Sequence, residues 1–365
     1  MRVGIMWRHY GERGGIAVYT DAVLRHLVAQ DDSTEYVVFV RPGATPPVQA
    51  PNLRYVPVAA RTKLTWDQFA LPAAAEREGI DVVFNPKLAV PLRGRFRTAF
   101  ALHGMEQVVE ARHFPLSNRL YVRATLPRFC RHADAIFCPT TIVKHEIAGR
   151  MGAAPDRIHV TPYGLQPQFL RPITDDDLAR VQQRYNLPAQ YLLFVGGLTP
   201  LKNLPTMLKA MARLRDRIPH QLVLTGFSRW TMESGLGAVR ELGLESRVHN
   251  AGWVDDDDQP ALYRLASALL LPSLYEGFGF PVIEAMASGC PVVTSKGGSL
   301  PEVAGDAALI VDALDDAQLA DAAQRIVEDS RLREELIARG LARASRFRWE
   351  PVAARLREVF ASLAG

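Results

Sequence analysis

The sequence is poor in cysteine, with only Cys130, Cys138 and Cys290 among its 365 residues. A small, odd number of cysteines is not typical of a disulfide framework. The sequence also has neither a CxxC pair nor the cysteine–histidine spacing of a structural zinc site. The composition therefore predicts a fold that is stabilised by its hydrophobic core, in a reducing compartment.

Long hydrophobic runs are missing as well. The strongest apolar run, residues 265–271, is far shorter than the roughly 20 residues that cross a bilayer. Residues 1–7 lack the apolar stretch and the cleavage site of a signal peptide. We therefore expect a cytoplasmic protein, either free or peripheral on the inner face of the membrane.

The chain has no basic stretch interleaved with aromatic residues, which disfavours nucleic acid as a partner. Its net charge of +4 is unevenly distributed: residues 1–165 contain 21 basic and 14 acidic residues, and residues 166–365 contain 22 and 25. A basic first half is suited to an anionic membrane or to a phosphorylated acceptor. It is equally consistent with a solvated surface that is rich in arginine.

The length predicts two domains, because a single hydrophobic core stops growing at about 250–300 residues. Short apolar runs alternate with amphipathic segments, which indicates βαβ units and parallel sheets. Prolines interrupt the pattern between residues 164 and 190. We expect an α/β fold of two Rossmann-like, doubly wound parallel-sheet domains that face each other across a cleft. The first comprises residues 1–170, joined by a C-terminal helix at 349–365, and the second comprises residues 171–348.

The expected strands are short buried segments. In the first domain they are residues 2–6, 36–40, 82–85, 98–102 and 135–138. In the second domain they are residues 191–195, 221–225, 247–251, 268–271 and 291–294. Helices are expected at residues 19–28, 204–215 and 281–287.

The most informative segment, residues 272–284, reads Pro-Ser-Leu-Tyr-Glu-Gly-Phe-Gly-Phe-Pro-Val-Ile-Glu and follows a buried strand. Gly277 and Gly279 permit close approach of the backbone to a ligand, and the proline after them suits the first turn of a helix. The free N–H groups at that helix start can bind a phosphate. Glu276 and Glu284 can accept hydrogen bonds from pairs of sugar hydroxyls. Taken singly, each glutamate is better explained by a loop cap or by the helix dipole.

Glu276 and Glu284 are separated by seven residues and match the EX7E motif, so the segment resembles the retaining glycosyltransferases of family 4, which have the GT-B fold. The resemblance extends over nearly the whole chain. It implies a hexosyltransferase that uses a nucleotide diphosphate sugar as donor. Glu276 would be a catalytic residue at the donor sugar, and Glu284 would contact the ribose hydroxyls. Donor contacts are also implied for four successive backbone N–H groups, those of Gly277, Phe278, Gly279 and Phe280.

A second segment, residues 194–203, joins a strand to a helix and contains Gly197 and Lys202. A lysine at a helix N-terminus can place its charge on a diphosphate, and Lys202 resembles the phosphate-binding lysine of the family. Many members have an arginine where this chain has Gly197. Either Lys202 acts with backbone amides alone, or another cation replaces that arginine. The candidate replacements are Arg13, Arg229 and Lys296.

Three further positions resemble parts of the family's site. Gly14 and Gly15 follow the first strand, in a loop that approaches the donor or the acceptor, although a tight turn that needs glycine explains them as well. His103 follows another strand and matches the histidine that faces the reacting sugar, which makes it a catalytic candidate. Val254 lies in the turn that meets the nucleotide base. The acidic residues 255–258 after it are expected to cap a helix.

The resemblance implies retention of configuration, by a front-face route in which the leaving phosphate helps to deprotonate the acceptor. It implies no metal and no other cofactor, because the fold family generally lacks a DxD metal motif. The segment before Lys202 is similar to that of bacterial mannosyltransferases that use GDP-mannose in polysaccharide assembly. The expected acceptor is a saccharide or a lipid-linked oligosaccharide.

Other readings of the sequence stay open. They are a transferase that uses a UDP-sugar, a nucleotide-sugar epimerase on the same fold, and a nucleotide-sugar-binding protein without activity. A nicotinamide dehydrogenase is disfavoured, because residues 11–16 do not form a GxGxxG fingerprint.

Overall fold

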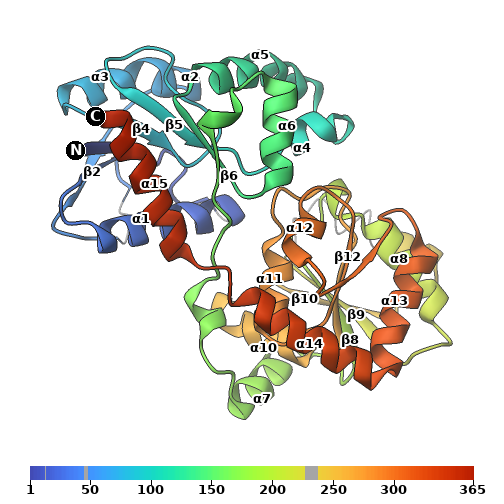
Figure 1. Ribbon diagram of the computed structural model, residues 1–365. Coiled ribbons are helices and arrows are strands. Elements are labelled where there is room, and N and C mark those ends of the chain that lie inside the picture. Colours follow the sequence, from blue (N-terminus) through green and yellow to red (C-terminus); the bar gives the residue numbers. More distant parts are fainter. Residues whose placement is uncertain (13, 45–47, 227–236) are drawn as a thin grey trace. The chain divides into compact units, whose positions relative to one another are not determined.

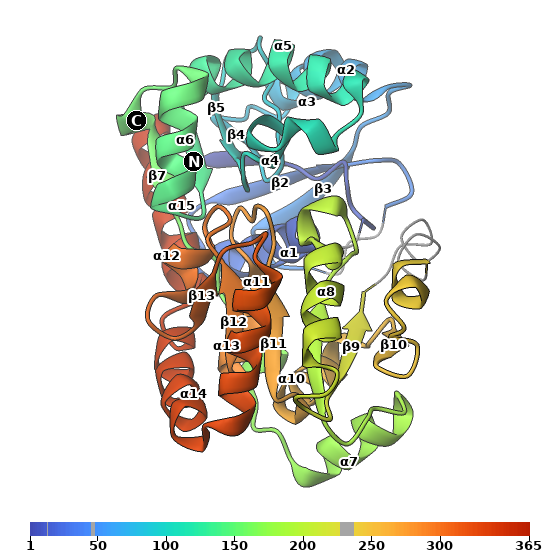
Figure 2. The same ribbon diagram turned by 90° about the vertical axis from the view of Figure 1, so that its right-hand side faces the viewer.

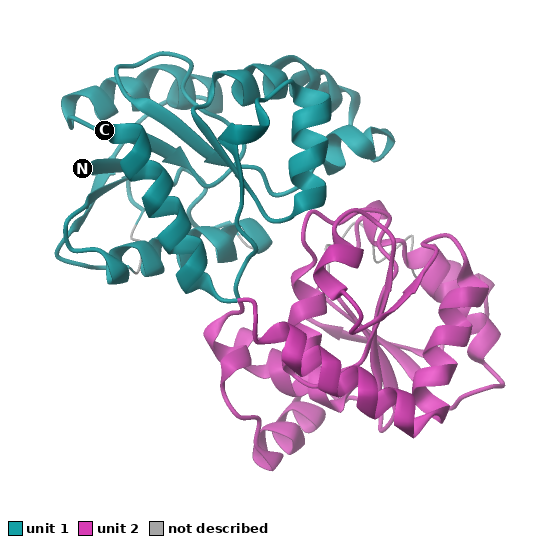
Figure 3. Cartoon of the chain, viewed as in Figure 1, with its two compact units in different colours: residues 1–164, 348–365 teal, residues 165–347 magenta. Residues whose placement is uncertain are grey.

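The structure, a computed structural model, describes residues 1–12, 14–44, 48–226 and 237–365. It divides the chain into two compact units (Figure 3). Unit 1 comprises residues 1–164 and 348–365, and unit 2 comprises residues 165–347. The sequence placed the first division after residue 170 and the second after residue 348, so both divisions lie earlier in the structure.

Unit 1 is built on a seven-stranded parallel sheet with the order β3-β2-β1-β4-β5-β6-β7 (Figures 1 and 2). Its strands are β1 (Arg2–Met6), β2 (Glu35–Val40), β3 (Leu53–Pro57), β4 (Val82–Asn85), β5 (Arg97–Ala101), β6 (Ala135–Cys138) and β7 (Ile158–Val160). The central strands are nearly continuous runs of buried apolar residues, because helices cover both faces of the sheet. The strand order reverses between β1 and β4, the place where open parallel sheets bind ligands.

The helices of unit 1 include α1 (Gly15–Gln30), α2 (Lys63–Thr65), α3 (Leu71–Arg77), α4 (Glu106–Val109), α5 (Leu116–His132), α6 (Thr141–Met151) and α15 (Trp349–Ala364). Helices α1 and α15 lie side by side on one face of the sheet, and α3 and α5 lie on the other (Figures 1 and 2). The Phe360 ring on α15 packs against those of Phe84 and Phe137. The C-terminal helix is therefore part of the core of unit 1.

Gly164 lies where the chain leaves unit 1, beside the start of α15. A Cβ atom at this position would lie 2.4 Å from the backbone nitrogen of Trp349. Only glycine permits so close an approach of two backbone segments.

Unit 2 repeats this plan with a six-stranded parallel sheet in the order β10-β9-β8-β11-β12-β13. Its strands are β8 (Tyr191–Val195), β9 (Gln221–Thr225), β10 (Val248–Gly252), β11 (Ala268–Leu271), β12 (Val292–Ser295) and β13 (Leu309–Val311). The order again reverses beside the first strand of the unit, between β8 and β11. Both units therefore have the predicted α/β, Rossmann-like, doubly wound topology.

The helices of unit 2 include α7 (Asp175–Arg184), α8 (Leu204–Leu214), α10 (Gln259–Leu265), α11 (Phe280–Ala287), α12 (Leu300–Ala304), α13 (Asp316–Glu328) and α14 (Ser330–Ala344). Helix α8 packs beside α13 on one face of the sheet, and α11 packs against α10 and α14 on the other (Figure 1). Within the described residues of both units, no helix combines the length and the apolar character needed to cross a membrane.

Three strands, β3, β7 and β13, were not predicted from the sequence. Each lies at an edge of its sheet, and β7 and β13 have only three residues. An edge strand is only partly covered, so it lacks the continuous apolar run that marked the central strands. The proline-rich segment 164–190 likewise contains a helix, α7, whose N-terminus is capped by the Thr174 side chain.

Candidate active site

The segments that the sequence singled out in unit 2 follow three neighbouring strands. Residues 196–203 follow β8, residues 272–279 follow β11, and residues 296–299 follow β12. Because these strands are parallel and adjacent, their three loops meet at one edge of the sheet. The loops are also bonded to one another: Leu274 N–H donates to Leu201 O over 2.7 Å, and Ser299 N–H donates to Glu276 O over 2.8 Å.

Glu276 and Lys202 form an ion pair at the centre of this edge. Lys202 Nζ lies 2.5 Å from Glu276 Oε1, and the Ser273 hydroxyl donates to the same oxygen over 2.7 Å. Both charged side chains are mostly buried, at 18% and 15% exposure. Two charges with so little solvent around them attract each other strongly. A charged group of a ligand could replace one member of the pair and bind the other.

Two glycines after β12 allow the third loop to pack directly on the loop that contains Glu276. A Cβ atom at Gly298 would lie 2.4 Å from Glu276 O, and a Cβ atom at Gly297 would lie 2.3 Å from Ser273 O. Gly298 also has a φ of 59°, in the left-handed region. These glycines thus fix the position of the Glu276 loop.

Asn203 is a positioning residue that sequence reasoning missed. It has a φ of 58°, and its side-chain amide donates to Pro272 O over 3.1 Å and to Ala313 O over 2.5 Å. The Thr206 hydroxyl donates to the side-chain oxygen Oδ1 of Asn203 over 2.9 Å. Asn203 therefore ties the Lys202 loop to the strand end before Glu276. Its adjacency to Lys202 was a signal, because asparagine tolerates the left-handed region.

Glu284 lies inside α11, with its side chain turned into the protein. It is 6% exposed, and Oε2 accepts a hydrogen bond of 2.8 Å from the Tyr263 hydroxyl on α10. Burial raises the pKa of its carboxyl from 4.5 to about 7, although the Tyr263 hydrogen bond and the nearby Lys202 charge act in the opposite direction. Glu284 is therefore close to half protonated at neutral pH.

The four residues that directly follow Glu276 have different parts in the structure. Gly279 has a φ of 94° and is the N-cap residue of α11, so the N–H groups of that helix begin at Phe280, and Gly277 and Phe278 lie in the loop before it. The Phe278 ring is buried against the Phe280 and Phe347 rings. The Phe278 side chain is therefore part of the packing of unit 2.

Gly197 lies in an open part of the β8 loop. A Cβ atom there would meet Gly226 O at 3.7 Å, an ordinary van der Waals distance. Of the cations proposed to replace the family's arginine, Arg13 and Arg229 lie outside the described residues, and Lys296 is exposed after β12. The structure does not identify a replacement among the described residues.

Val254 is buried after β10, and the acidic residues that follow it lie at the N-terminus of α10 as expected, with Asp258 as the N-cap residue. No side-chain cap hydrogen bond is formed at Asp258. Its buried carboxylate instead accepts hydrogen bonds from Arg180, from Arg184 over 2.8 Å and from the Tyr185 hydroxyl over 2.9 Å. Asp258 is thus satisfied by two guanidinium groups of α7 and not by the N–H groups of α10.

His103 lies in unit 1, just after β5, and both of its ring nitrogens are bonded. Nε2 donates to Pro86 O over 2.7 Å, so Nδ1 accepts from the Tyr163 hydroxyl at 2.5 Å. Burial lowers its pKa to about 4, so the ring is neutral. Catalysis by His103 stays a prediction, and in this structure the ring is held by two hydrogen bonds.

Gly14 and Gly15 lie at the start of α1 in unit 1. Gly14 has a φ of 106°, and its carbonyl accepts the first hydrogen bonds of the helix, from Ala17 and Val18. The left-handed backbone explains the need for glycine at position 14. Contact of this loop with a donor stays a prediction.

The chain is similar to known proteins along most of its length. Residues 13–169 match the family model of glycosyltransferase family 4, and residues 175–343 match that of glycosyl transferases group 1. The chain is 33% identical over 283 residues to O-antigen chain mannosyltransferase B of Escherichia coli, a match that covers 76% of this chain and 74% of that protein. It is 30% identical over 253 residues to the MMP alpha-(1->4)-mannosyltransferase of Mycolicibacterium hassiacum, covering 67% and 58% of the two chains.

A further relative is the D-inositol 3-phosphate glycosyltransferase of Acidothermus cellulolyticus, 34% identical over 231 residues, which are 60% of this chain and 51% of that protein. Several matches thus span only about half of the relative.

Solved structures show the same fold. Sucrose-phosphate synthase from Thermosynechococcus elongatus has a TM-score of 0.80 at 23% identity, covering 99% of this chain and 98% of that one. Anabaena HepE in complex with UDP-glucose has a TM-score of 0.77 at 17% identity, covering 99% and 100%.

Two doubly wound parallel sheets, matched along their whole length by such structures, define a protein of the GT-B fold. The identity with the Escherichia coli mannosyltransferase and the two family models make the assignment more specific. The chain belongs to glycosyltransferase family 4.

Proposed function

We propose that the chain transfers a hexosyl group from a nucleotide diphosphate sugar to a saccharide or a lipid-linked acceptor in cell-surface polysaccharide biosynthesis. The observation that carries the proposal is the buried pair of Lys202 and Glu276 at the start of two helices. Mannose from GDP-mannose is the favoured donor, because two of the relatives are named as mannosyltransferases, one of them of the O-antigen chain.

Lys202 is the residue that stabilises the leaving group. Negative charge develops on the diphosphate as the glycosyl bond breaks, and a preorganised ammonium in a dry site lowers the free energy of that state. In the structure the charge of Lys202 is balanced by Glu276. When the donor binds, its phosphate replaces the Glu276 carboxylate as the partner of Lys202. Glu276 can then accept hydrogen bonds from hydroxyls of the donor sugar.

Glu284 is proposed to bind the ribose hydroxyls of the donor. Its carboxylate form accepts hydrogen bonds better than its protonated form, and the pKa of about 7 makes that form incomplete at neutral pH. Donor affinity is therefore expected to rise as the pH rises from 6 to 8.

Retention of configuration is proposed to follow a front-face route, in which the leaving phosphate accepts the proton of the attacking hydroxyl. The two motif glutamates are assigned to binding, in contrast to the acid and nucleophile pair of retaining glycosidases. Proton NMR of the product during the first turnovers reads the anomeric configuration directly. An inverted product would contradict this route.

The reaction is proposed to need no metal and no other cofactor, because Lys202 supplies positive charge at the leaving group. EDTA should therefore leave the initial rate unchanged. A large loss of rate that Mg²⁺ or Mn²⁺ restores would contradict the proposal.

The protein is proposed to work in the cytoplasm, in peripheral contact with an anionic membrane and without nucleic acid. Leu116, Leu120 and Tyr121 on α5 are exposed, next to the exposed Arg119 and Arg123. An apolar and basic face of this kind binds anionic lipid surfaces. Co-sedimentation with phosphatidylglycerol vesicles should exceed that with phosphatidylcholine vesicles, and equal sedimentation would contradict the proposal.

Two measurements separate the alternatives. Thermal-shift titration with GDP, UDP and ADP identifies the base, because only the nucleotide that binds raises the melting temperature. A preference for UDP would favour a UDP-sugar donor, the ligand in the HepE complex. Incubation with the donor alone would yield an isomerised sugar if the chain were an epimerase.

The proposal as a whole is tested by the variants Glu276→Gln and Glu284→Gln in combination. We expect loss of transfer and of donor binding in a folded protein. Unchanged donor affinity and turnover in the double variant would overturn the assignment. If the unaltered chain bound the donor but transferred no sugar, it would be a binding protein without activity.

A further inference from the structure

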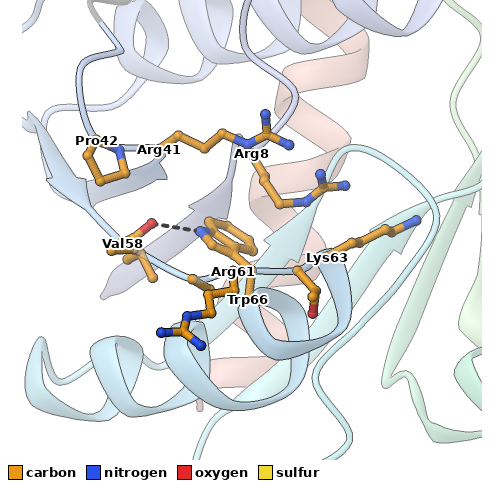
Figure 4. A pocket seen from close by; sticks show the side chains of 10 residues that line it. Arg8, Arg41, Pro42, Val58, Arg61, Lys63 and Trp66 are labelled. Carbon is orange, nitrogen blue, oxygen red and sulfur yellow. Dashed lines mark hydrogen bonds between the residues drawn. The ribbon is translucent and has the colours of Figure 1, made fainter.

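Unit 1 contains a cavity of about 430 Å³ whose lining is strongly basic (Figure 4). The cavity is lined by Arg8, Arg41, Pro42, Val58, Ala59, Ala60, Arg61, Thr62, Lys63 and Trp66. Figure 4 shows the four cationic side chains, Arg8, Arg41, Arg61 and Lys63, around the indole ring of Trp66. This set is called the basic cavity below.

The basic cavity lies at the edge of the sheet where ligands of open parallel sheets bind. Arg8 follows β1, Arg41 follows β2, and Arg61 follows β3, and these strands are neighbours in the order β3-β2-β1. All three are parallel, so their carboxyl ends share one edge. A smaller cavity shares Arg8, Lys63 and Trp66 and continues to Lys87 after β4, beside the reversal of strand order.

The positive charge of the basic cavity is not balanced by the described part of the protein. The nearest carboxylate is that of Asp67, whose Oδ1 lies 3.5 Å from Arg8 Nε. No described carboxylate lies within ion-pair distance of Arg41, Arg61 or Lys63. Arg54, on the neighbouring strand β3, shows the contrast, because it pairs with Glu35 at 2.8 Å and with Glu78 at 2.5 Å.

Arg8 is the most informative of the four cations. Its side chain is only 15% exposed, and its buried Nε atom has no hydrogen-bond partner among the described residues. That nitrogen faces the Asp67 carboxylate at 3.5 Å, a distance too long for a good hydrogen bond, so Asp67 balances the charge of Arg8 only in part. The remaining positive charge of the cavity comes from Arg41, Arg61 and Lys63.

The shape and chemistry of the basic cavity indicate what kind of anion it takes. Its volume is several times that of a phosphate ion and lies in the range of small-molecule sites. Three guanidinium groups and one ammonium match the several oxygens of a phosphate, which guanidinium groups bind in a bidentate manner. The ring of Trp66 is held by a hydrogen bond of 2.9 Å from Nε1 to Val58 O and supplies a rigid apolar wall.

We infer that the basic cavity binds the phosphate of the acceptor, so that the acceptor is a phosphorylated saccharide. The phosphate belongs either to a soluble sugar phosphate or to the diphosphate of a lipid-linked saccharide. The inference rests on the proposed transferase function, because it assigns a chemical class to the acceptor of that reaction. It also gives a place to part of the excess positive charge of the first half of the chain.

The test uses the full chain and the double variant Arg61→Ala/Lys63→Ala. Both residues are exposed at the rim of the cavity, so the variant should fold, which its melting temperature checks. Arg93→Ala is the matched control, because Arg93 is an exposed cation of unit 1 outside the basic cavity. Calorimetry measures binding of inorganic phosphate, of mannose 6-phosphate and of a short-chain polyprenyl diphosphate disaccharide.

We expect the double variant to weaken binding of the phosphorylated probes at least tenfold, while Arg93→Ala changes it less than twofold. In transfer assays the KM for the phosphorylated acceptor should rise at least tenfold with kcat within about twofold. Tighter binding of mannose 6-phosphate would indicate the soluble source, and tighter binding of the polyprenyl diphosphate would indicate the lipid-linked source. Either result supports the inference.

Phosphate binding that is equal in the variant and the control would overturn the inference, and so would equal transfer to phosphorylated and dephosphorylated acceptors. Loss of vesicle binding without loss of binding to soluble phosphate probes would also overturn it, in favour of a membrane contact. Nucleotide binding is measured in the same variants. If nucleotide binding and transfer persist, only this inference fails; if the unaltered chain binds no nucleotide, the proposed transferase function fails instead.

Discussion

The two units have the same strand order but opposite chemistry at the carboxyl edge of the sheet. In unit 2 the edge is made of short glycine-containing loops around one buried ion pair, Lys202 and Glu276. In unit 1 the edge carries long cationic side chains, such as Arg8 and Arg61, that surround a cavity with little balancing charge. The fold thus sets where a ligand binds, and the loops set which ligand binds there.

The difference is the one expected from the two ligands proposed above. A nucleotide sugar presents many hydroxyls and a diphosphate, so glycines that expose backbone N–H groups and a single lysine suit it. A phosphate on a variable acceptor requires charge and reach, which arginine and lysine side chains supply without close backbone approach. The predictions below test whether the two edges differ in function as they differ in chemistry.

The largest effect is expected from Lys202→Ala. Loss of the ammonium should lower kcat by about 10²–10³-fold, the usual cost of removing one group that stabilises a developing charge. Steady-state kinetics with saturating donor measures it. The control is Lys209→Ala, which removes an exposed lysine on α8, the helix that follows Lys202, and should stay within twofold of the unaltered chain. A kcat of Lys202→Ala within threefold of that of the unaltered chain would mean that the two edges do not differ in function as proposed.

A smaller effect is expected from Gly298→Ala, which tests the loop packing around Glu276. The new Cβ would lie 2.4 Å from Glu276 O, in a backbone with a φ of 59°. We expect the free energy of unfolding to fall by about 2–4 kcal/mol, through strain and overpacking. Denaturant titration measures it, and Gly197→Ala is the control, since its Cβ has room. Equal stability of the two variants would show that the loop yields at no cost.

The segment around Glu276 could be singled out from the sequence because its residues are close together along the chain. Glu276, Gly279 and Glu284 lie within one loop and one helix, and local rules for glycine and helix starts apply to them. What sequence reasoning missed there is the bonding between loops, such as Asn203 to Pro272 and Gly298 against Glu276. Those contacts join residues about 20 to 70 positions apart, which no local pattern reveals.

The basic cavity of unit 1 could not be located from the sequence for the same reason. Arg8, Arg41, Arg61 and Lys63 are spread over more than 50 residues, and only the order β3-β2-β1 brings them together. The sequence shows the excess of basic residues in the first half of the chain, but it does not show where their side chains gather in the fold. The edge strands β3, β7 and β13 were missed because partial burial leaves no continuous apolar run, although the edge strand β10 was predicted.

Glu284→Gln tests whether burial of a charge at the donor edge has a cost in stability. The folded-state pKa of about 7 lies above the unfolded value of 4.5, so the free energy of unfolding is reduced as the pH rises from about 4.5 through 7. The variant should be more stable than the unaltered chain by about 1–3 kcal/mol at pH 8 and equal to it near pH 4.5. Melting curves at several pH values measure this difference.

The same variant should bind the nucleotide about tenfold more weakly at pH 8, with no dependence on pH between 6 and 8. Glu241→Gln, which removes an exposed carboxylate of unit 2, should change neither property by more than about 0.5 kcal/mol. A Glu284→Gln protein that is less stable than the unaltered chain at pH 8 would contradict the assignment of the raised pKa to burial.

The smallest effect is a gain, expected from Gly197→Arg. The backbone at Gly197 is not in the left-handed region, and among the described residues a Cβ there meets only Gly226 O, at 3.7 Å. An arginine should therefore fit and add a bidentate contact to the diphosphate, tightening nucleotide binding by up to about tenfold, or roughly 1.4 kcal/mol. Gly197→Gln, which adds a shorter, uncharged side chain, separates charge from bulk. Equal nucleotide affinity of the two variants would mean that Lys202 and the backbone amides already satisfy the diphosphate. Tighter binding of phosphate probes in the basic cavity of Gly197→Arg would mean that the two edges are not independent.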